Sequence, residues 1–152
     1  MSRQKSIVVV IGVALLLTTV IVITVGAWTA RKDVVISLNG KSYTTEVVTT
    51  EADRSKGLSG RDTLGNHEAM LFVFDKEGYY PFWMKDMKFA IDIVWLDSDM
   101  RVVHKEVDVR PDSYPESSYV SEGEAKYVLE LATGEARDLQ QGTVLTIKKG
   151  EI

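Results

Sequence analysis

The stretch VVISLNGKSYTTEVVTT, residues 34 to 50, decides the fold class of this 152-residue chain. Two runs rich in valine, isoleucine and threonine, Val34 to Leu38 and Lys41 to Thr50, flank the dipeptide Asn39-Gly40. Asparagine and glycine accept the positive φ angles of a type I′ turn, which joins adjacent antiparallel strands. The stretch therefore predicts a β-hairpin at the start of a β-rich domain.

Short β-like runs continue to the end of the chain, separated by residues that form turns. They cover Ala69 to Phe74, Phe82 to Met84, Ile91 to Leu96, Arg101 to Val109, Lys126 to Leu131 and Thr143 to Lys148. Seven or eight short strands favour an all-β fold, and we expect a compact antiparallel barrel or sandwich.

One short helix is expected directly after the hairpin. Thr50 can cap this helix, and Gly57 can end it after Lys56. Glu51 and Asp53 lie in the first turn, where negative charge favours the helix dipole. The pattern predicts no other full helix in the β-rich domain.

A long uncharged apolar segment, Ile7 to Trp28, precedes the β-rich region. As a helix it would span about 33 Å, enough to cross a hydrocarbon core of roughly 30 Å. The basic residues Arg31 and Lys32 follow it, as is typical of a membrane anchor. We expect a single transmembrane helix in the lipid bilayer, with residues 1–30 as anchor and residues 31–152 as an extracytoplasmic β domain. The alternative is a cleaved signal segment and a secreted domain.

The composition excludes several classes of function. The chain has no cysteine, which rules out disulfides, zinc–thiolate sites and a thiol nucleophile. His67 and His104 lack the close spacing of a metal motif, so we predict no metal site. The formal net charge of −4 gives no general attraction to nucleic acid. There is no glycine-rich phosphate loop of either common form, and we expect no cofactor.

Five motifs follow one another in an order that is specific when taken together. They are RSKGLSGRDTL at 54–64, MLFVF at 70–74, FWMKDM at 82–87, IDI at 91–93, and YVLE at 127–130 followed by Gly134. In order and spacing, from about Val34 to Ile147, the chain resembles the domain-of-unknown-function family 192. The resemblance implies a compact, mostly β domain behind a signal or anchor, and no established activity. Ser59 departs from the family pattern, where methionine is common, and so does the run from Asp86 to Ala90.

Two acidic residues interrupt apolar strands. Strand alternation places Asp92 on the face that it shares with Val94, and Glu130 lies in a similar apolar run. Buried carboxylates need hydrogen-bonding partners, and Arg54 and Arg61 beside the glycine turns are the candidates. One hypothesis is that these residues form structural ion bridges between helix, loop and sheet. The other is that they form an acid–base pair or a polar ligand site.

A second candidate surface is the run Phe82-Trp83-Met84 beside Lys85. An aromatic ring and a thioether near a cation could form a shallow platform for a sugar, a peptide or another flat ligand. Large apolar residues more often pack in a core, and this interpretation is favoured for Trp83 and more strongly for Met84.

The sequence indicates location and fold more clearly than activity. We expect a membrane-tethered binding or envelope-accessory module whose partner is a small molecule, a glycan or a protein. A hydrolase-like enzyme that uses Asp92 or Glu130 with Arg54 is the second hypothesis, and it requires the two acids near one another at a cleft. A structural partner domain of a membrane complex is the third, and it requires a large exposed apolar patch.

Overall fold

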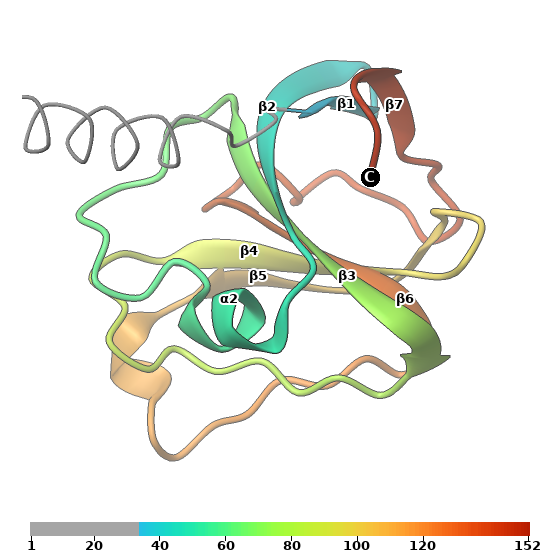
Figure 1. The fold of residues 1–152 in the computed structure, drawn as a ribbon. Coiled ribbons are helices and arrows are strands. Elements are labelled where there is room, and N and C mark those ends of the chain that lie inside the picture. Colours follow the sequence, from blue (N-terminus) through green and yellow to red (C-terminus); the bar gives the residue numbers. More distant parts are fainter. Residues whose placement is uncertain (1–33) are drawn as a thin grey trace, which may run out of the picture. The chain divides into compact units, whose positions relative to one another are not determined.

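The hairpin opens the structure, a computed structural model that describes residues 34–152 (Figure 1). Strand β1 (Val34–Leu38) pairs antiparallel with β2 (Lys41–Val48). Asn39 and Gly40 join the two strands with φ angles of 50° and 79°, as a type I′ turn requires. The predicted hairpin is confirmed.

Replacing Gly40 with valine should lower the free energy of unfolding by about 1 to 3 kcal/mol, since a β-branched residue is strained at positive φ. No atom lies within 4 Å of the position that a Cβ would occupy, so the cost comes from the backbone conformation. Urea denaturation measures the difference. The matched variant Gly40→Asn should cost less, because asparagine tolerates this conformation. Equal stability of Gly40→Val and the parent chain would remove the turn assignment.

Seven strands form a single sheet in the order β5-β4-β6-β3-β2-β1-β7. After the hairpin they are β3 (Glu68–Gly78), β4 (Ile91–Leu96), β5 (Val102–Val109), β6 (Ala125–Ala132) and β7 (Thr146–Lys149). Every neighbouring pair is antiparallel except β2 and β3. The sheet is therefore mixed, which corrects the prediction of an antiparallel fold.

The parallel β2–β3 pair follows from the connection between these strands. After Val48 the chain passes through helix α2 (Glu51–Lys56) and a loop before β3 begins at Glu68. A connection of this length can cross over and return in the original direction, whereas a tight turn joins only antiparallel strands. The helix of the crossover is the one that was predicted. Thr50 Oγ1 accepts a hydrogen bond from the backbone N–H of Asp53 at 3.1 Å and caps it.

The sheet curls strongly, as Figure 1 shows, but no continuous ladder closes it. The backbone N–H of Val102, at the start of β5, donates to the carbonyl of Thr143 at 2.9 Å. The N–H of Leu145, just before β7, donates to the carbonyl of Met100 at 2.9 Å. These bonds join the chain segments next to the two edge strands, β5 and β7. The β content and the number of strands are confirmed, whereas the predicted barrel or sandwich is replaced by one curled sheet.

Apolar side chains pack on both faces of the sheet, as two clusters. The first core contains Val34, Ile36, Leu38, Tyr43, Ala69, Leu71, Val94, Leu96, Val102, Leu129, Leu131, Ala136, Leu139 and Leu145. The second core contains Val48, Leu58, Met70, Phe72, Met84, Ile91, Ile93, Trp95, Val109, Ala125 and Val128. Strand β4 is buried throughout and contributes alternate residues to both. Any polar residue on β4 must therefore find its partners inside the protein.

The strand predicted from Phe82 to Met84 is wrong. Only Phe82 pairs there, in an isolated bridge in which it and Tyr119 exchange two backbone hydrogen bonds of 2.8 Å. Pro81, directly before it, has no N–H to extend a ladder. The loop predicted from Arg110 to Ser118 contains one short 3-10 turn, η1 (Pro111–Ser113).

The apolar segment from Ile7 to Trp28 lies outside the residues that the structure describes. From Val34 to the end of the chain, no helix is long and apolar enough to span a bilayer. The transmembrane helix therefore stays a prediction from the sequence.

Candidate functional site

A pocket of about 360 Å³ lies between helix α2, strand β3 and the chain from Tyr80 to Met87. Because Glu130 lines it, we call it the Glu130 pocket. Its polar wall comes from α2 and the turn that follows, and consists of Glu51, Arg54, Ser55, Lys56 and Ser59. Its aromatic wall comes from β3 and the segment after it, and consists of Phe72, Phe74, Tyr80, Phe82 and Trp83.

Contacts between the rings hold the aromatic wall in place. The rings of Phe74 and Tyr80 are stacked with centroids 3.6 Å apart, and those of Phe72 and Phe82 meet edge to face at 4.9 Å. Phe82 also contacts the buried ring of Trp95 edge to face at 6.0 Å. The wall is thus continuous with the second core, and its rings support one another.

Trp83 lies at the mouth of the pocket, with 47% of its surface exposed. The interpretation of Trp83 as a core residue is therefore wrong, whereas Met84 is buried in the second core as expected. Met84 packs into the second core, and the adjacent side chain of Trp83 lies at the surface. The platform hypothesis is the one compatible with the position of Trp83.

Lys85 is exposed and does not line the pocket, but its backbone supports the polar wall. The hydroxyl of Ser59 donates to the carbonyl of Lys85 at 2.8 Å, and the N–H of Gly60 donates to that of Asp86 at 2.9 Å. These bonds join the turn after α2 to the loop that carries Trp83. The two walls are therefore connected through the backbone.

The carboxyl group of Glu130 lies at the floor of the pocket, on central strand β6. Glu130 is only 6% exposed, and its Oε2 atom has no hydrogen-bond partner among residues 34–152. Burial away from water raises the pKa of Glu130 to about 8, although the positive charge of Arg61 acts in the opposite direction. At neutral pH the group is therefore mostly protonated, so that it can both donate and accept a hydrogen bond.

Arg61, predicted as a partner of Asp92 or Glu130, forms its ion pair with Glu46 on β2 at 2.7 Å. Glu46 pairs in register with Met70, and Met70 pairs with Glu130. Residues paired across strands share a face of the sheet, so Glu46 and Glu130 lie on the same face, one strand apart. The sequence reasoning missed Glu46. The available signal was its position in β2, two residues before the buried Val48.

Arg54 lines the pocket but forms an ion bridge with neither Asp92 nor Glu130. Its guanidinium donates to the backbone carbonyl of Thr49 and to that of Val73, the latter at 2.9 Å. It also lies 5.0 Å from the centroid of the Phe74 ring, within range of a cation–π interaction. Arg54 therefore fastens α2 to β3, and the predicted bridge to an acidic partner is wrong.

Arg54→Ala should lower the free energy of unfolding by about 1 to 2 kcal/mol, because two hydrogen bonds from a half-buried cation to backbone carbonyls are lost. Since Asp92 lies on the other face of the sheet, the effect of Arg54→Ala should add to that of Asp92→Asn within about 0.5 kcal/mol. Urea denaturation of both single variants and the double variant tests this. Strong coupling between the two substitutions would support an ion bridge between Arg54 and Asp92, which the geometry contradicts.

Asp92 lies on the opposite face from Glu130, among the residues of the first core. In the register of β4 and β6, Asp92 pairs with Leu131, and Glu130 pairs with Ile93 of the second core. The sequence prediction that Asp92 shares its face with Val94 is confirmed. The structure does not bring the two acids together at one cleft.

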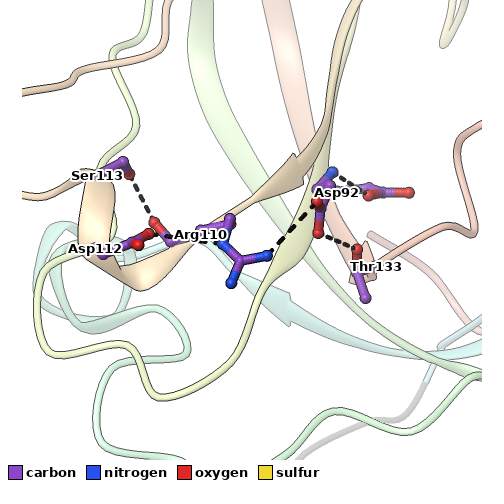
Figure 2. Close-up of polar contacts among 6 residues, drawn as sticks. Asp92, Arg110, Asp112, Ser113 and Thr133 are labelled. Carbon is purple, nitrogen blue, oxygen red and sulfur yellow. Dashed lines mark hydrogen bonds and ion pairs between the residues drawn. The ribbon is translucent and has the colours of Figure 1, made fainter.

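Two backbone N–H groups satisfy the fully buried carboxyl of Asp92. Oδ1 accepts from Asp108 at 2.9 Å and Oδ2 accepts from Ala136 at 2.7 Å. Asp108 lies at a β-bulge, where β5 carries one more residue than the facing segment of β4. Its φ angle is 53°. Figure 2 shows Asp92 next to Thr133, whose hydroxyl donates to Asp108 at 3.2 Å. Asp92 therefore fixes a bulge and a loop, which is a structural role.

Histidine and acidic residues do not gather into a metal site in the described part of the chain, where no group of three could hold an ion. The Nε2 atom of His104 lies 3.3 Å from Glu106, its neighbour on the same face of β5. The chemistry of the Glu130 pocket is instead that of a small aromatic site with one buried carboxyl group and cations in its polar wall.

The fold and the pocket define a small β-sheet domain with one crossover helix and an aromatic-lined cleft. A family model confirms the resemblance stated from the motifs: it is DUF192, "Uncharacterized ACR", and it matches residues 34–147. The chain belongs to this family. The comparison with curated proteins found no match.

Two solved structures resemble the domain. A protein of unknown function from Novosphingobium aromaticivorans is 26% identical with a TM-score of 0.68, over 75% of this chain and 83% of that one. A protein described as a putative transcription regulator from Sinorhizobium meliloti is 24% identical, also with a TM-score of 0.68, over 75% of this chain and 91% of that one. The second likeness concerns the fold alone.

Proposed function

We propose that the domain is a binding module that takes a small molecule in the Glu130 pocket. The observation that carries the proposal is the Oε2 atom of Glu130, buried without a hydrogen-bond partner among the described residues at the floor of an aromatic-lined pocket. An unsatisfied buried polar group costs about 1 to 3 kcal/mol, and native proteins contain few of them. A ligand that pairs with this carboxyl would remove the cost.

The enzyme hypothesis is less well supported than binding. General acid–base hydrolysis by two carboxylates needs both at one cleft, and Asp92 and Glu130 lie on opposite faces of the sheet. Both carboxyl oxygens of Asp92 also already accept a hydrogen bond from a backbone donor. The hypothesis of a structural partner domain gains no specific support from the described residues.

Blocking the pocket tests the binding function. Ser55 and Ala52 both lie exposed on α2, but only Ser55 lines the pocket, so Ser55→Trp should obstruct it and Ala52→Trp serves as the matched control. In a thermal-shift screen of chemically mixed small molecules, a compound that binds the native state raises the unfolding midpoint. We expect hits on the parent chain and on Ala52→Trp, and their loss on Ser55→Trp. The same shifts on all three proteins, or no hit at all, would overturn the proposal.

We further propose that the segment from Ile7 to Trp28 tethers the domain to a membrane, with the domain outside the cytoplasm. The support is the length of this uncharged apolar segment and the basic residues that follow it. The full chain should stay in the membrane pellet after carbonate extraction, with an intact N-terminus by mass spectrometry. Release into the soluble fraction with an N-terminus near Trp28 would indicate a cleaved signal.

A further inference from the structure

We propose that the ligand of the Glu130 pocket is a single neutral sugar ring, packed with its C–H face on the aromatic wall and with its hydroxyl groups toward the polar wall and Glu130. This inference rests on the proposed binding function and specifies its ligand class. It follows from the arrangement of the two walls, from the hydrogen-bonding capacity of the floor, and from the balance of charge around the pocket.

The two walls match the two sides of a sugar ring. The aromatic wall ends at the half-exposed indole of Trp83, and behind it lies the ring of Phe72, which is buried in the second core. The polar wall presents the hydroxyls of Ser55 and Ser59 with the longer polar side chains of α2. A pyranose has a face of C–H groups, which stacks on aromatic rings, and a rim of hydroxyl groups, which form hydrogen bonds. A purely apolar ligand would displace water from the exposed polar side chains of α2 without replacing its hydrogen bonds, and a purely polar one would leave the rings unused.

The floor favours a hydroxyl group over a charged group. A protonated carboxyl such as that of Glu130 offers one donor and one acceptor, and a hydroxyl group also offers both. A hydroxyl can therefore pair with Oε2 whether Glu130 is protonated or not. A ligand cation would have to enter beside the positive charges of Arg54 and Lys56, and a ligand carboxylate would face the negative charge of Glu130 as soon as that group ionised.

Charges of both signs line the entrance, which is also consistent with a neutral ligand. Glu51 is negative, whereas Arg54 and Lys56 are positive, and the guanidinium of Arg54 is already bonded to two backbone carbonyls. The pocket volume of about 360 Å³ is near the lower end for small-molecule sites, typically about 300 to 1,000 Å³. This size favours one ring in the pocket, with any further sugar units of a glycan outside it.

Isothermal titration of the full chain, kept in a detergent without sugar groups, tests the inference. The probes are methyl glucoside, methyl galactoside, methyl mannoside and N-acetylglucosamine, with tetramethylammonium chloride and sodium benzoate as charged alternatives. We expect at least one of the sugars to bind and both charged probes to fail. Trp83→Ala should weaken sugar binding about tenfold, whereas Tyr79→Ala, which alters another exposed ring that does not line the pocket, should leave it unchanged.

A second pair of variants tests the floor. Glu130→Leu removes the hydrogen-bonding group while filling the same apolar space, and should weaken sugar binding at least about tenfold. Glu130→Gln keeps a donor and an acceptor and should retain most of the affinity. Circular dichroism and unfolding midpoints verify that each variant is folded. Because an apolar residue suits this buried position, Glu130→Leu should fold at least as stably as the parent chain.

The possible outcomes separate the two proposals. One outcome is that benzoate or tetramethylammonium binds, that Ser55→Trp abolishes this binding, and that no sugar binds. The pocket then does bind a ligand, but the sugar inference is wrong. Sugar binding that is indifferent to both Trp83→Ala and Glu130→Leu would place the sugar elsewhere and also overturn the inference. If no probe binds and the thermal-shift screen yields no hit that depends on the pocket, both proposals fail.

Discussion

Asp92→Ala is expected to lower the free energy of unfolding by about 3 to 5 kcal/mol. The variant removes both acceptors from two N–H groups, those of Asp108 and Ala136, which bond the fully buried carboxyl at 2.9 and 2.7 Å. It also leaves space in the first core, beside two N–H groups that have lost their acceptor. A domain of this size is stable by roughly 5 to 15 kcal/mol, so a large part of the total would be lost.

Urea denaturation of Asp92→Ala and of Asp112→Ala makes the comparison. Asp112 belongs to the cluster drawn in Figure 2, but its side chain is 82% exposed and lies 3.8 Å from Arg110. Exposed ion pairs contribute little, so Asp112→Ala should change stability by less than about 0.5 kcal/mol. Similar small effects of both substitutions would mean that Asp92 does not hold the bulge and the loop together.

Local patterns predicted the elements that depend on a few neighbouring residues. Asn39-Gly40 determines its turn through the φ angles that these two residues accept, and Thr50 determines the start of α2 through one capping hydrogen bond. Period-two alternation placed Asp92 on the face of Val94, where it is found. Each of these inferences needs only the sequence within a few positions.

Long-range pairing was beyond the same reasoning. The parallel register of β2 and β3 depends on the path of the whole crossover between them. Neither strand's own sequence determines which strand it pairs with. The partners of Asp92 are backbone N–H groups of Asp108 and Ala136, and every residue except proline carries such a group. The pattern of residue types therefore indicated an arginine partner for Asp92, whereas its carboxylate accepts its hydrogen bonds from the backbone.

The candidate site was predicted in part. Glu130, Arg54 and Trp83, named from the sequence, line one pocket, whereas Arg61 lies beside it in an ion pair with Glu46. The aromatic wall was missed because Phe72 and Phe74 belong to a strand, where aromatic residues normally indicate packing. Their role as a wall appears only when the chain from Tyr80 to Trp83 folds back against them.

Glu130 should make the stability of the domain fall as the pH rises from about 4.5 to about 8. Burial raises its pKa from 4.5 to about 8, so the folded protein keeps a proton that the unfolded chain releases. The contribution is fully present below the unfolded pKa of 4.5 and is lost as the pH passes through 8. At about 1.4 kcal/mol per pKa unit, the total loss is on the order of 5 kcal/mol.

The difference between the parent chain and Glu130→Gln isolates this effect, because every other titrating group is common to both proteins. Glutamine resembles the protonated form of Glu130, so the two proteins should have similar stability in urea at pH 4.5, and the variant should be more stable at pH 9. The charges on the elements around the carboxyl include Glu51, Arg54 and Lys56 on α2, Arg61 on the loop after it, and Glu46 on β2, and the substitution leaves all of them in place. A sugar hydroxyl bonded to Oε2 should shift the midpoint of the difference curve only slightly, whereas a bound cation would lower it strongly by favouring the ionised carboxyl. Parallel pH profiles of the two proteins would show that water reaches Glu130. The buried, unpartnered Oε2 atom on which both proposals depend would then be contradicted.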